Sequence, residues 1–547
     1  MMAVCVVGAG IMGAGIAQVA AQAGHTVYLV DTRAGAAQSA IAQIRPQLHA
    51  LAQKGKISAE AANAAHDRLR VADTLEAAVT AAAETDREQG IGLVVEAIAE
   101  QLEAKRALFQ QLECVVPPDC ILASNTSSIS ITAIANGLRN PERLVGMHFF
   151  NPVPLMQLVE VVSGLQTDVS VAQATFDLAT AWGKVAVHAR STPGFIVNRI
   201  ARPYYAEALA LLQEQAATPE AIDACLRGAG FRMGPCELMD LIGHDTNFAV
   251  TQSVYAANFY DKRFQPSLVQ HALVDGGLLG RKSGRGFYRY PSPATPALPS
   301  VPKTPDTPTP PASGTAPGPG WQQALTVHGH GAVAEALFKR LQAANTGAQP
   351  LPVLRQAESD WTGLSSIGNH GHAGHDAQSR QTFQLRLTDG RCATALGRNV
   401  AVFDLPLATL PTHGAGSPTA PTSPPPLAWA PSAVISADWL DAVPRLLQVL
   451  GFNPIAMADT PGLVVARSVA MLINEAADAV HQGVCSRDAA DAAMRRGVNY
   501  PAGPLEWLDG WGAAPVCALL DALDRHYRGE RYRTSPWLLM QVWKASA

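Results

Sequence analysis

The sequence lacks the features that would place this protein on nucleic acid, in a membrane or outside the cell. Its formal net charge is -4 and it has no Lys/Arg stripe, which argues against a nucleic-acid partner. No apolar run approaches the roughly 20 residues that cross a bilayer, and the first strand pattern begins without a basic leader. The eight cysteines are scattered singly, as is typical of reduced thiols. We therefore expect a cytoplasmic protein without a membrane or nucleic-acid partner.

The length and composition are those of a multidomain globular protein. A chain of 547 residues exceeds what one hydrophobic core usually serves, so roughly two to four domains are expected. A hydrophobic share of 48% and a mean hydropathy of +0.07 are ordinary for such proteins.

Residues 3–31 carry the clearest local pattern in the chain. An apolar run leads into the turn Gly8-Ala9-Gly10-Ile11-Met12-Gly13, and a small-residue helical stretch and a second apolar run then end at Asp31. This order predicts a βαβ unit that holds a dinucleotide pyrophosphate at the N-terminus of the helix. A carboxylate at the end of the second strand binds a ribose 2′-OH and repels a 2′-phosphate, so Asp31 favours NAD over NADP, a preference that Arg33 slightly weakens. The alternative is a structural turn in a fold that has lost its ligand.

Polar residues stand at or near the ends of the next apolar runs. The strand patterns at 92–95, 121–124 and 144–148 are followed by polar residues or end in them, and ligands of open α/β sheets bind at the carboxyl ends of strands. Glu160 lies inside the apolar run 158–162, where an unpaired carboxylate would be costly, so it needs a partner. His148 is the natural one, because a carboxylate orients an imidazole and stabilises its charged form, as a general base requires. The alternative for His148 is a hydrogen-bonded core histidine.

Two helical segments follow Asp31, one at 34–53 and one that ends near Leu69. This insertion is longer than a plain dinucleotide-binding fold needs. Lys54 and Lys56 between the two helices suit an anionic substrate, with solvated surface charge as the alternative.

Three runs resemble the L-3-hydroxyacyl-CoA dehydrogenase family, and the resemblance extends over about residues 1–290. The runs are Ser124-Asn125-Thr126-Ser127-Ser128, His148-Phe149-Phe150-Asn151-Pro152 and Thr192-Pro193-Gly194-Phe195-Ile196-Val197-Asn198-Arg199. The resemblance implies oxidation of L-3-hydroxyacyl-CoA to 3-oxoacyl-CoA with NAD. It makes His148 the base and Glu160 its orienter, and it makes Ser127 and Asn198 hydrogen-bond donors around the substrate oxygen.

The same resemblance implies the binding residues. We expect the cofactor to contact the turn and the residues that the family uses around it: Gly8, Gly10, Ile11, Met12, Gly13, Asp31, Glu100, Lys105, Ser127, Asn151 and Lys282. Lys54 and Ser127 are expected to bind the coenzyme A substrate. Gln47 stands where the family has a CoA-contacting serine, so that single contact is not expected here.

The sequence pattern predicts helices over residues 193–290. The pattern predicts one long helix over 193–215 with a bend at Pro203, a second helix over 219–226, and further helices beyond. This block resembles the family's second domain, which closes over the acyl chain and commonly dimerises. A homodimer through the helical domains is therefore expected.

The chain partly repeats itself after a Pro-rich linker. Residues 461–467 match 193–199 at a constant shift (461 − 193 = 268), and 503–509 echo 234–240 with a slip of one residue. A worn glycine turn at 324–334 and a strand at 400–404 indicate a decayed dinucleotide-binding fold. The second copy has no His-Phe-Phe-Asn-Pro run, and Ala466 stands where Asn198 stood, so it is expected to be non-catalytic.

Five histidines in glycine-rich surroundings could indicate a metal site, but solvated side chains are the simpler interpretation. They are His328, His330, His370, His372 and His375. No metal is therefore expected.

The sequence thus predicts five segments. These are an α/β Rossmann-type dinucleotide-binding domain (1–190), an all-α 3-hydroxyacyl-CoA dehydrogenase C-terminal domain (191–290), a Pro-rich linker (291–320), a degenerate Rossmann-like domain (321–455) and a second all-α domain (456–547). Two other functions stay open: a non-enzymatic binding or structural protein on this fold, and an NADPH-dependent 3-oxoacyl-CoA reductase. The acyl chain also stays open, since the chain resembles both 3-hydroxybutyryl-CoA and 3-hydroxyadipyl-CoA dehydrogenases, of fatty-acid or phenylacetate-type aromatic-acid degradation.

Overall fold

The computed structural model describes residues 2–85, 90–290, 325–328, 335, 339, 353–356, 383–410 and 423–546. These residues form two compact units, the first made of Met1–Ala201 and Ala476–Leu505 and the second of Arg202–Glu475 and Glu506–Ala547. The predicted linker at 291–320, the worn glycine turn beyond His328 and most of the break at 414–426 lie outside the described residues.

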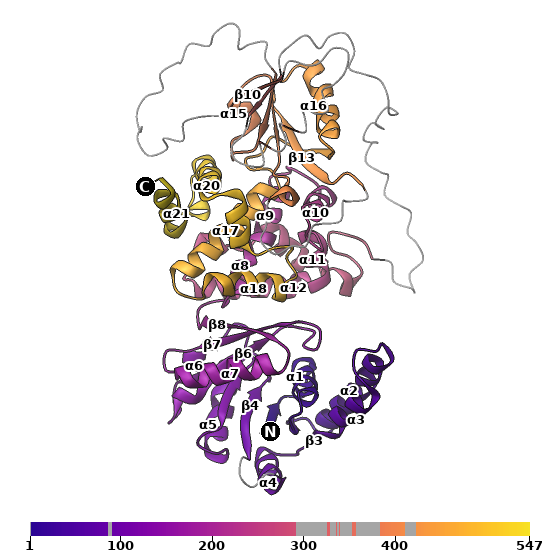
Figure 1. The fold of residues 1–547 in the computed structure, drawn as a ribbon, viewed down its shortest axis with the longest axis vertical. Helices are drawn as coiled ribbons and strands as arrows, with labels where there is room; N and C mark the ends of the chain where they lie inside the picture. Colours follow the sequence, from indigo (N-terminus) through magenta and orange to yellow (C-terminus); the bar gives the residue numbers. More distant parts are fainter. Residues whose placement is uncertain are drawn as a thin grey trace. The chain divides into compact units, whose positions relative to one another are not determined.

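The first unit is built on an eight-stranded sheet (Figure 1). Its strand order is β3-β2-β1-β4-β5-β6-β7-β8, and β7 runs antiparallel to β6 while the other neighbours are parallel. The strands are β1 (Ala3–Val7), β2 (Val27–Val30), β3 (Leu69–Val71), β4 (Ile91–Glu96), β5 (Ile121–Ser124), β6 (Leu144–Phe149), β7 (Leu158–Ser163) and β8 (Val185–Arg190). The central strands are nearly continuous apolar runs because helices cover both faces of the sheet.

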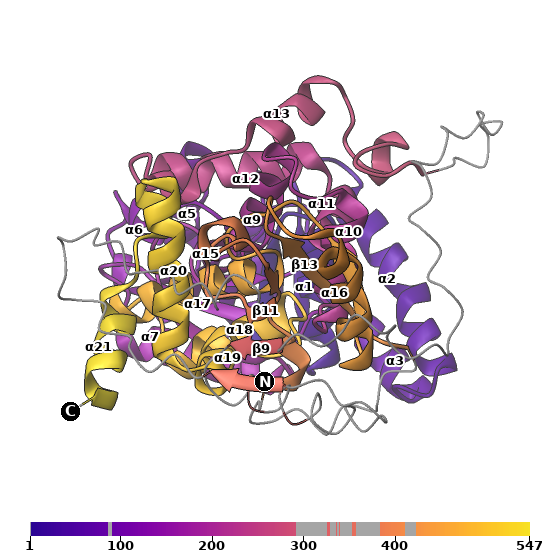
Figure 2. The ribbon, with the colours of Figure 1, turned by 90° about the horizontal axis from the view of Figure 1, so that it is seen from above.

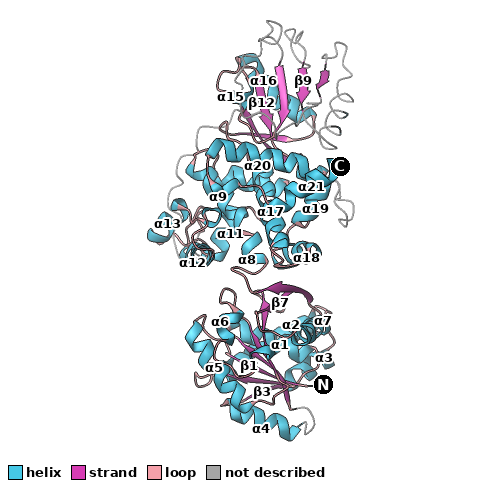
Figure 3. Cartoon of the chain, turned by 90° about the vertical axis from the view of Figure 1, so that its left-hand side faces the viewer, coloured by secondary structure: helices cyan, strands magenta, loops and turns pink. Residues whose placement is uncertain are grey.

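Those helices flank the sheet on its two sides (Figure 3). They are α1 (Ile11–Gln22), α2 (Ala36–Gln53), α3 (Ala59–Asp67), α4 (Leu75–Thr85), α5 (Leu102–Val115), α6 (Ile131–Ala135) and α7 (Val169–Ala181). The short helix α8 (Val197–Ile200) follows β8 in the chain and does not belong to these two layers. The pair α2 and α3 packs as a hairpin against α1, with Ile44 and Leu48 buried and Lys54 exposed at its tip. The sequence-predicted insertion is therefore a helical hairpin on the dinucleotide-binding fold.

The second unit contains a smaller sheet of order β10-β9-β11-β12-β13-β14. Its strands are β9 (Leu325–His328), β10 (Val353–Gln356), β11 (Phe383–Leu387), β12 (Val400–Phe403), β13 (Pro426–Pro431) and β14 (Asn453–Ala456), with the helices α15 (Ala393–Leu396) and α16 (Ala437–Val449). The antiparallel pair β12 and β13 followed by parallel β14 repeats the arrangement of β6, β7 and β8. The degenerate second copy of the α/β fold is thus present as a sheet.

The remaining helices come from two similar stretches of chain, the helical copies, and in the second copy α20 and α21 pack side by side (Figure 2). The first helical copy comprises α9 (Arg202–Gln213), α10 (Pro219–Gly228), α11 (Pro235–Ile242), α12 (His244–Ala257) and α13 (Leu268–Asp275), and the second comprises α17 (Val465–His481), α18 (Arg487–Gly497), α19 (Pro504–Trp511), α20 (Ala513–Tyr527) and α21 (Pro536–Ser546). The turns that precede the two copies have the same unusual backbone. Gly194 and Phe195 have φ 77° and 48°, and Gly462 and Leu463 have φ 73° and 52°.

The predicted long helix over 193–215 is wrong in its bounds. A turn occupies 192–196, α8 begins at Val197, and the helix breaks at Ala201 rather than bending at Pro203. Pro203 has no N–H for the carbonyl of Arg199, and its ring crowds that carbonyl, so the break falls just before the proline. The second copy has Met471 at this position, and α17 runs unbroken from Val465 to His481.

Each helical copy contacts the sheet of the other copy. In the second unit α10 packs on β13, and in the first unit α18 packs on β7 and β8. A Cβ on Gly228 would lie 2.9 Å from Pro426, and one on Gly497 would lie 2.6 Å from Leu158. Pro426 and Leu158 differ by the repeat shift (426 − 158 = 268). The two contacts are therefore equivalent.

The two helical copies also exchange ion pairs within the second unit. Arg531 Nη2 lies 2.8 Å from Glu207 Oε1, and Arg263 Nη1 lies 3.3 Å from Glu475 Oε2. The repeat shift carries Glu207 onto Glu475 and Arg263 onto Arg531 (475 − 207 = 268; 531 − 263 = 268). Each copy thus donates an arginine to the same glutamate of the other, as in a two-fold symmetric interface.

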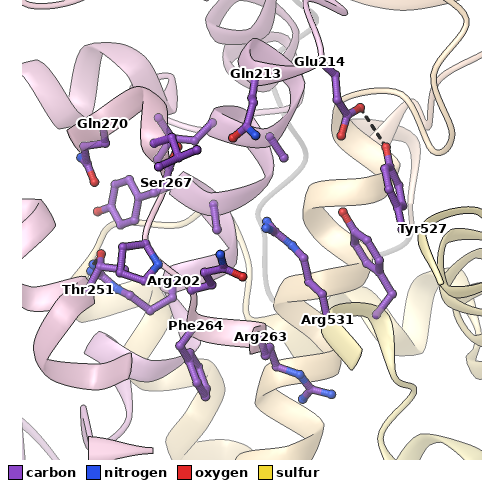
Figure 4. Close-up of a pocket in the computed structure, with 18 of the residues that line it drawn as sticks. Arg202, Gln213, Glu214, Thr251, Arg263, Phe264, Ser267, Gln270, Tyr527 and Arg531 are labelled. Atoms are coloured by element: carbon purple, nitrogen blue, oxygen red, sulfur yellow. Dashed lines mark hydrogen bonds between the residues drawn. The ribbon is translucent and has the colours of Figure 1, made fainter. Parts of the chain in front are cut away.

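A cavity of about 290 Å³ lies beside these ion pairs (Figure 4). Its lining includes four arginines, Arg202, Arg263, Arg467 and Arg531, and Glu214, which accepts a hydrogen bond from the Tyr527 hydroxyl at 2.8 Å. Arg467 and Arg531 both donate to Glu207. Three of these arginines, Arg263, Arg467 and Arg531, therefore form ion pairs with a glutamate of the other helical copy.

Among the described residues, no helix is long and apolar enough to cross a membrane.

Candidate active site

The glycine turn joins β1 to α1. Gly8 has φ +105°, and a Cβ on Gly13 would lie 1.7 Å from the carbonyl oxygen of Gly8, so the turn needs glycine at both positions. A Cβ on Gly10 would meet no heavy atom within 4 Å, and Ile11 at the start of α1 is 79% exposed. The N-terminus of α1 is therefore open, and its N–H groups are available for a pyrophosphate. The residues fit a dinucleotide.

Asp31 follows β2 directly and lies against the turn. Its Oδ2 accepts a hydrogen bond from the N–H of Ala9 at 2.7 Å, and its Oδ1 accepts one from the N–H of Arg33 at 2.9 Å. Burial alone would raise the pKa of Asp31, but the Arg33 guanidinium and the Ala9 and Arg33 N–H groups hold it below its ordinary value. A charged carboxylate therefore stands beside the turn, where a ribose 2′-OH is expected.

A cluster of charged side chains joins the end of β4 to the first turn of α5. Lys105 Nζ lies 2.5 Å from Glu96 Oε1 and 3.3 Å from Glu100 Oε2, and the Lys105 and Glu96 side chains are buried. Ser124 Oγ donates to Glu96 Oε2 at 2.6 Å. The ammonium of Lys105 is thus committed to these two carboxylates, and any effect it has on a cofactor passes through Glu100.

Glu100 fixes the loop that carries Ser127. Its Oε1 accepts hydrogen bonds from Thr126 Oγ1 at 2.7 Å and from the N–H groups of Ser127 and Ser128 at 2.9 and 3.0 Å. Burial alone would raise the pKa of Glu100, but the Lys105 charge and these hydrogen bonds lower it. The Ser127 hydroxyl stays exposed while its backbone is held.

His148 and Glu160 form a buried pair across the antiparallel strands β6 and β7. They are directly opposite in the register, and His148 Nδ1 lies 2.6 Å from Glu160 Oε2. Both side chains are at most 4% exposed. The rings of Phe150 and Phe195 pack on the imidazole at centroid distances of 4.5 and 5.7 Å. The pair therefore lies in a largely dry setting, with Nε2 as the ring nitrogen not bonded to Glu160.

The second oxygen of Glu160 holds the start of α8. Glu160 Oε1 accepts hydrogen bonds from the N–H groups of Ile196 and Val197 at 3.1 and 2.9 Å. Asn198 is the next residue and is half-buried. One carboxylate thus orients the imidazole and fixes the backbone that carries Asn198.

Asn125 ties the Ser127 loop to the strand of His148. Its Oδ1 accepts the N–H of Phe149 at 2.9 Å. Through Asn125, Glu100 and Glu160, the structure brings the loops of Ser127, His148 and Asn198 together on neighbouring strands of one unit. This arrangement can orient an oxygen substituent beside an imidazole base.

The other predicted binding residues are more dispersed. Asn151 is exposed just after β6, Met12 is half-buried in α1, and Lys54 is exposed at the hairpin tip. Lys282 belongs to the second unit, where its Nζ lies 2.5 Å from Asp245 Oδ1. The five histidines considered as a metal site and interpreted as solvated side chains lie outside the described residues, apart from the backbone of His328. The described residues contain no group of three or more His, Cys, Asp or Glu side chains that could hold a metal ion.

The second copy keeps a carboxylate that holds the start of its helix and has no histidine at the position of His148. Asp404 follows β12 and accepts the N–H groups of Val464, Val465 and Ala466 at 2.6–2.9 Å at the start of α17. Its own N–H bonds the carbonyl of Ala428, which lies one repeat shift after Glu160 (428 − 160 = 268). Asp404 therefore takes the place of His148 in the register, and one carboxylate replaces the pair.

The predicted site omits Glu96 and Asn125. Glu96 ends an apolar strand pattern as Glu160 interrupts one, so the same argument about buried carboxylates could have led to Lys105 as its partner. Asn125 lies inside the run that carries Ser127, but its role depends on a strand far along the chain. No local sequence pattern predicts the hydrogen bond from the Phe149 N–H to Asn125 Oδ1.

Known proteins match the chain at the level of domains. Residues 3–192 match the NAD binding domain of 3-hydroxyacyl-CoA dehydrogenase, and residues 194–290 and 462–545 match its C-terminal domain. The first sheet with its helices and the helical copies are therefore the predicted Rossmann-type and C-terminal folds, and the fold class is confirmed.

Individual relatives agree with these matches. A 3-hydroxyadipyl-CoA dehydrogenase of Escherichia coli (strain K12) is 42% identical over 531 residues, which cover 97% of this chain and 95% of the relative. A probable 3-hydroxybutyryl-CoA dehydrogenase of Bacillus subtilis (strain 168) is 41% identical over 288 residues, covering 52% of this chain and 96% of the relative. The crystal structure of a 3-hydroxybutyryl-CoA dehydrogenase from Escherichia coli K12 matches with a TM-score of 0.77 and 40% identity, covering 100% of this chain and 99% of that one. The chain belongs to the 3-hydroxyacyl-CoA dehydrogenase family of oxidoreductases.

Proposed function

We propose that the first copy oxidises L-3-hydroxyacyl-CoA to 3-oxoacyl-CoA with NAD and that His148 is the general base. The observation that carries this proposal is the buried His148–Glu160 pair at 2.6 Å, in the same unit as the glycine turn and Asp31. A charged carboxylate on Nδ1 fixes the tautomer of the ring and makes the other nitrogen a better proton acceptor.

The proposed chemistry divides between the cofactor and the side chains. When bound, NAD accepts the hydride from C3 of the substrate. His148 Nε2 takes the proton of the 3-hydroxyl, and Glu160 stabilises the imidazolium that forms. Ser127 and Asn198 hydrogen-bond to the substrate oxygen as it becomes a carbonyl.

The proposed binding residues follow from their places in the fold. Gly8, Gly10, Ile11, Met12 and Gly13 hold the pyrophosphate at the N-terminus of α1, and Asp31 selects a ribose 2′-OH. Glu100, Lys105, Asn151 and Lys282 complete the cofactor site by resemblance, with Lys105 acting through Glu100. Lys54, exposed on the hairpin, binds the anionic coenzyme A moiety.

The proposed substrates are acyl-CoA intermediates of fatty-acid or phenylacetate-type aromatic-acid degradation. Two similar full-length proteins have different names, one a 3-hydroxyadipyl-CoA and the other a 3-hydroxybutyryl-CoA dehydrogenase. Both acyl groups are therefore carried as candidates for this chain.

Initial rates over a substrate panel test this proposal. The purified chain is assayed with C4 to C10 and dicarboxyl L-3-hydroxyacyl-CoA substrates, with NAD and NADP in parallel. We expect NADH formation with at least one substrate and a kcat/KM for NAD at least about tenfold above that for NADP, because Asp31 repels a 2′-phosphate. No turnover with any substrate would support the non-enzymatic alternative, and a preference for NADPH in the reverse direction would support the reductase alternative.

The second copy is proposed to be non-catalytic and to replace a dimer partner within the chain. The reciprocal packing of α10 on β13 and α18 on β7, and the reciprocal ion pairs of Glu207 and Glu475, support this choice over an enlarged dimer interface. The five predicted segments, from 1–190 to 456–547, are kept as the proposed domain division. The predicted homodimer through the helical domains is the competing proposal, in which the second copy enlarges the dimer interface.

The cytoplasm remains the proposed location. All eight cysteines are free thiols in the structure, and burial raises the pKa of several of them, including Cys5 and Cys120, to about 12. Unpaired cysteines are typical of proteins in a reducing compartment, which supports this proposal.

A further inference from the structure

Lys184 is a buried lysine whose ammonium, among the described residues, donates to backbone carbonyls and to no side chain. It lies in the turn between α7 and β8 and is 8% exposed. Its Nζ donates to the carbonyl oxygens of Val153 and Met156, at 2.5 and 2.8 Å. Among the described residues no carboxylate forms an ion pair with it, and burial lowers its pKa to about 8. A buried ammonium without a counter-charge is costly and so requires a structural reason.

The two carbonyls belong to the turn that joins the strands of the proposed base pair. Residues 150–157 connect β6, which carries His148, to β7, which carries Glu160. Within the turn the N–H groups of Leu155 and Met156 both bond the carbonyl of Pro152. The carbonyls of Val153 and Met156 receive the Lys184 ammonium, which can serve both because it has three donors.

The same turn rests on the helix of the glycine turn. A Cβ on Gly15 of α1 would lie 2.8 Å from Val153 Cβ and 3.4 Å from Pro154 Cδ, and Val153 is 2% exposed. Val153 therefore packs on the backbone of α1 about one helical turn after Ile11. The position of the 152–156 turn and that of the pyrophosphate-binding helix depend on each other.

We propose that Lys184 is a positioning residue for the dinucleotide site. It holds the 152–156 turn at both ends, which seats Val153 against α1 and fixes the approach of Asn151 to the cofactor. Among the described residues, no hydrogen bond or ion pair joins the Lys184 ammonium to a predicted binding residue, so its effect passes through the turn. The proposal rests on the proposed NAD site, and its test is a binding measurement that needs no turnover.

The test compares NADH and acyl-CoA binding in matched variants. Lys184→Met keeps the length of the side chain and removes the donors, and Lys544→Met makes the same change at an exposed lysine of α21. NADH fluorescence is expected to give a Kd about tenfold weaker for Lys184→Met, because two buried carbonyls lose their donor and the turn shifts from α1. The Kd for acetoacetyl-CoA is expected to change less than about twofold, since the proposed CoA contact at Lys54 lies on the α2–α3 hairpin.

Gly15→Ala probes the same contact from the other side and does not depend on the folding of the Lys184 variant. It should also weaken NADH binding, and the double variant should lose less than the product of the two single effects, because both displace one turn. An NADH Kd within twofold of the parent for Lys184→Met would overturn the proposal. Equal losses of NADH and acetoacetyl-CoA binding would also overturn it, since they indicate general destabilisation. If the parent itself failed to bind NADH, the proposed cofactor site would be wrong.

Discussion

Replacing His148 by glutamine is expected to lower kcat for NADH formation about a thousandfold, because a general base contributes on the order of 10² to 10⁴ in rate. Glutamine retains a hydrogen-bonding group near Glu160 and cannot take the proton of the 3-hydroxyl. The imidazole is buried between Phe150 and Phe195, so the substitution removes little of the exposed binding surface. We expect KM for the acyl-CoA to change less than about threefold.

Steady-state rates of three proteins separate the base from a structural effect. His188→Gln is the matched control, because His188 is an exposed histidine of β8 in the same unit that stacks on Phe176. Its kcat should stay within twofold of the parent. Turnover of His148→Gln within a few-fold of that control would show that His148 is not the base.

Replacing Arg467 by methionine is expected to destabilise the protein by about 3–5 kcal/mol, because it leaves the buried carboxylate of Glu207 without one of its two arginine partners. Arg467 Nε lies 2.6 Å from Glu207 Oε2, and both side chains are at most 1% exposed. The Tyr532 hydroxyl also donates to Glu207 at 3.0 Å. Urea unfolding followed by tryptophan fluorescence measures the loss. A change below about 1 kcal/mol would contradict the assignment of this network as the main polar link between the helical copies.

Two further variants serve as comparisons for Arg467→Met. Arg227→Met breaks the partly exposed pair with Glu237, whose arginine side chain is 45% exposed, and should cost less than about 1 kcal/mol. Burial alone would raise the pKa of Glu207, but Arg531 and Arg467 hold it below the ordinary glutamate value of 4.5. A depressed carboxylate pKa stabilises the folded chain above pH 4.5 and loses that effect as pH falls through the folded value. The stability difference between the parent and Glu207→Gln should therefore shrink on acidification below pH 4.5.

The network also explains what the second copy contributes to the fold. Glu207 and Glu475 are equivalent positions, and each receives an arginine from the opposite helical copy. Asp404 holds the start of α17 with backbone hydrogen bonds, as Glu160 does for α8. Ala428 stands in place of Glu160, the proposed orienter of the base, and Ala466 stands in place of Asn198. The second copy has thus retained the contacts that hold helices and has lost those proposed to hold substrate.

The sequence predicts the parts of the site that depend on local patterns. The turn of Gly8, Gly10 and Gly13, the acid at Asp31 and the pairing of Glu160 with His148 follow from strand and helix periodicity together with the cost of burying a carboxylate. These features lie within single βαβ units or on neighbouring strands. Their physical causes are visible in short stretches of chain.

Features that join distant segments are not predictable in this way. The second oxygen of Glu160 binds the start of α8 across 36 residues, and the Arg467–Glu207 pair spans 260. Such contacts need the tertiary arrangement, and the periodic pattern of each segment alone is compatible with several arrangements.

The stoichiometry of NADH binding tests most directly the central claim that the first copy alone carries the site. Fluorescence titration of the parent chain at a protein concentration well above Kd should give one NADH bound per chain of 547 residues, and His148→Gln should bind the same amount without turnover. Two NADH molecules per chain would contradict the account, because the second copy would then hold a working dinucleotide site.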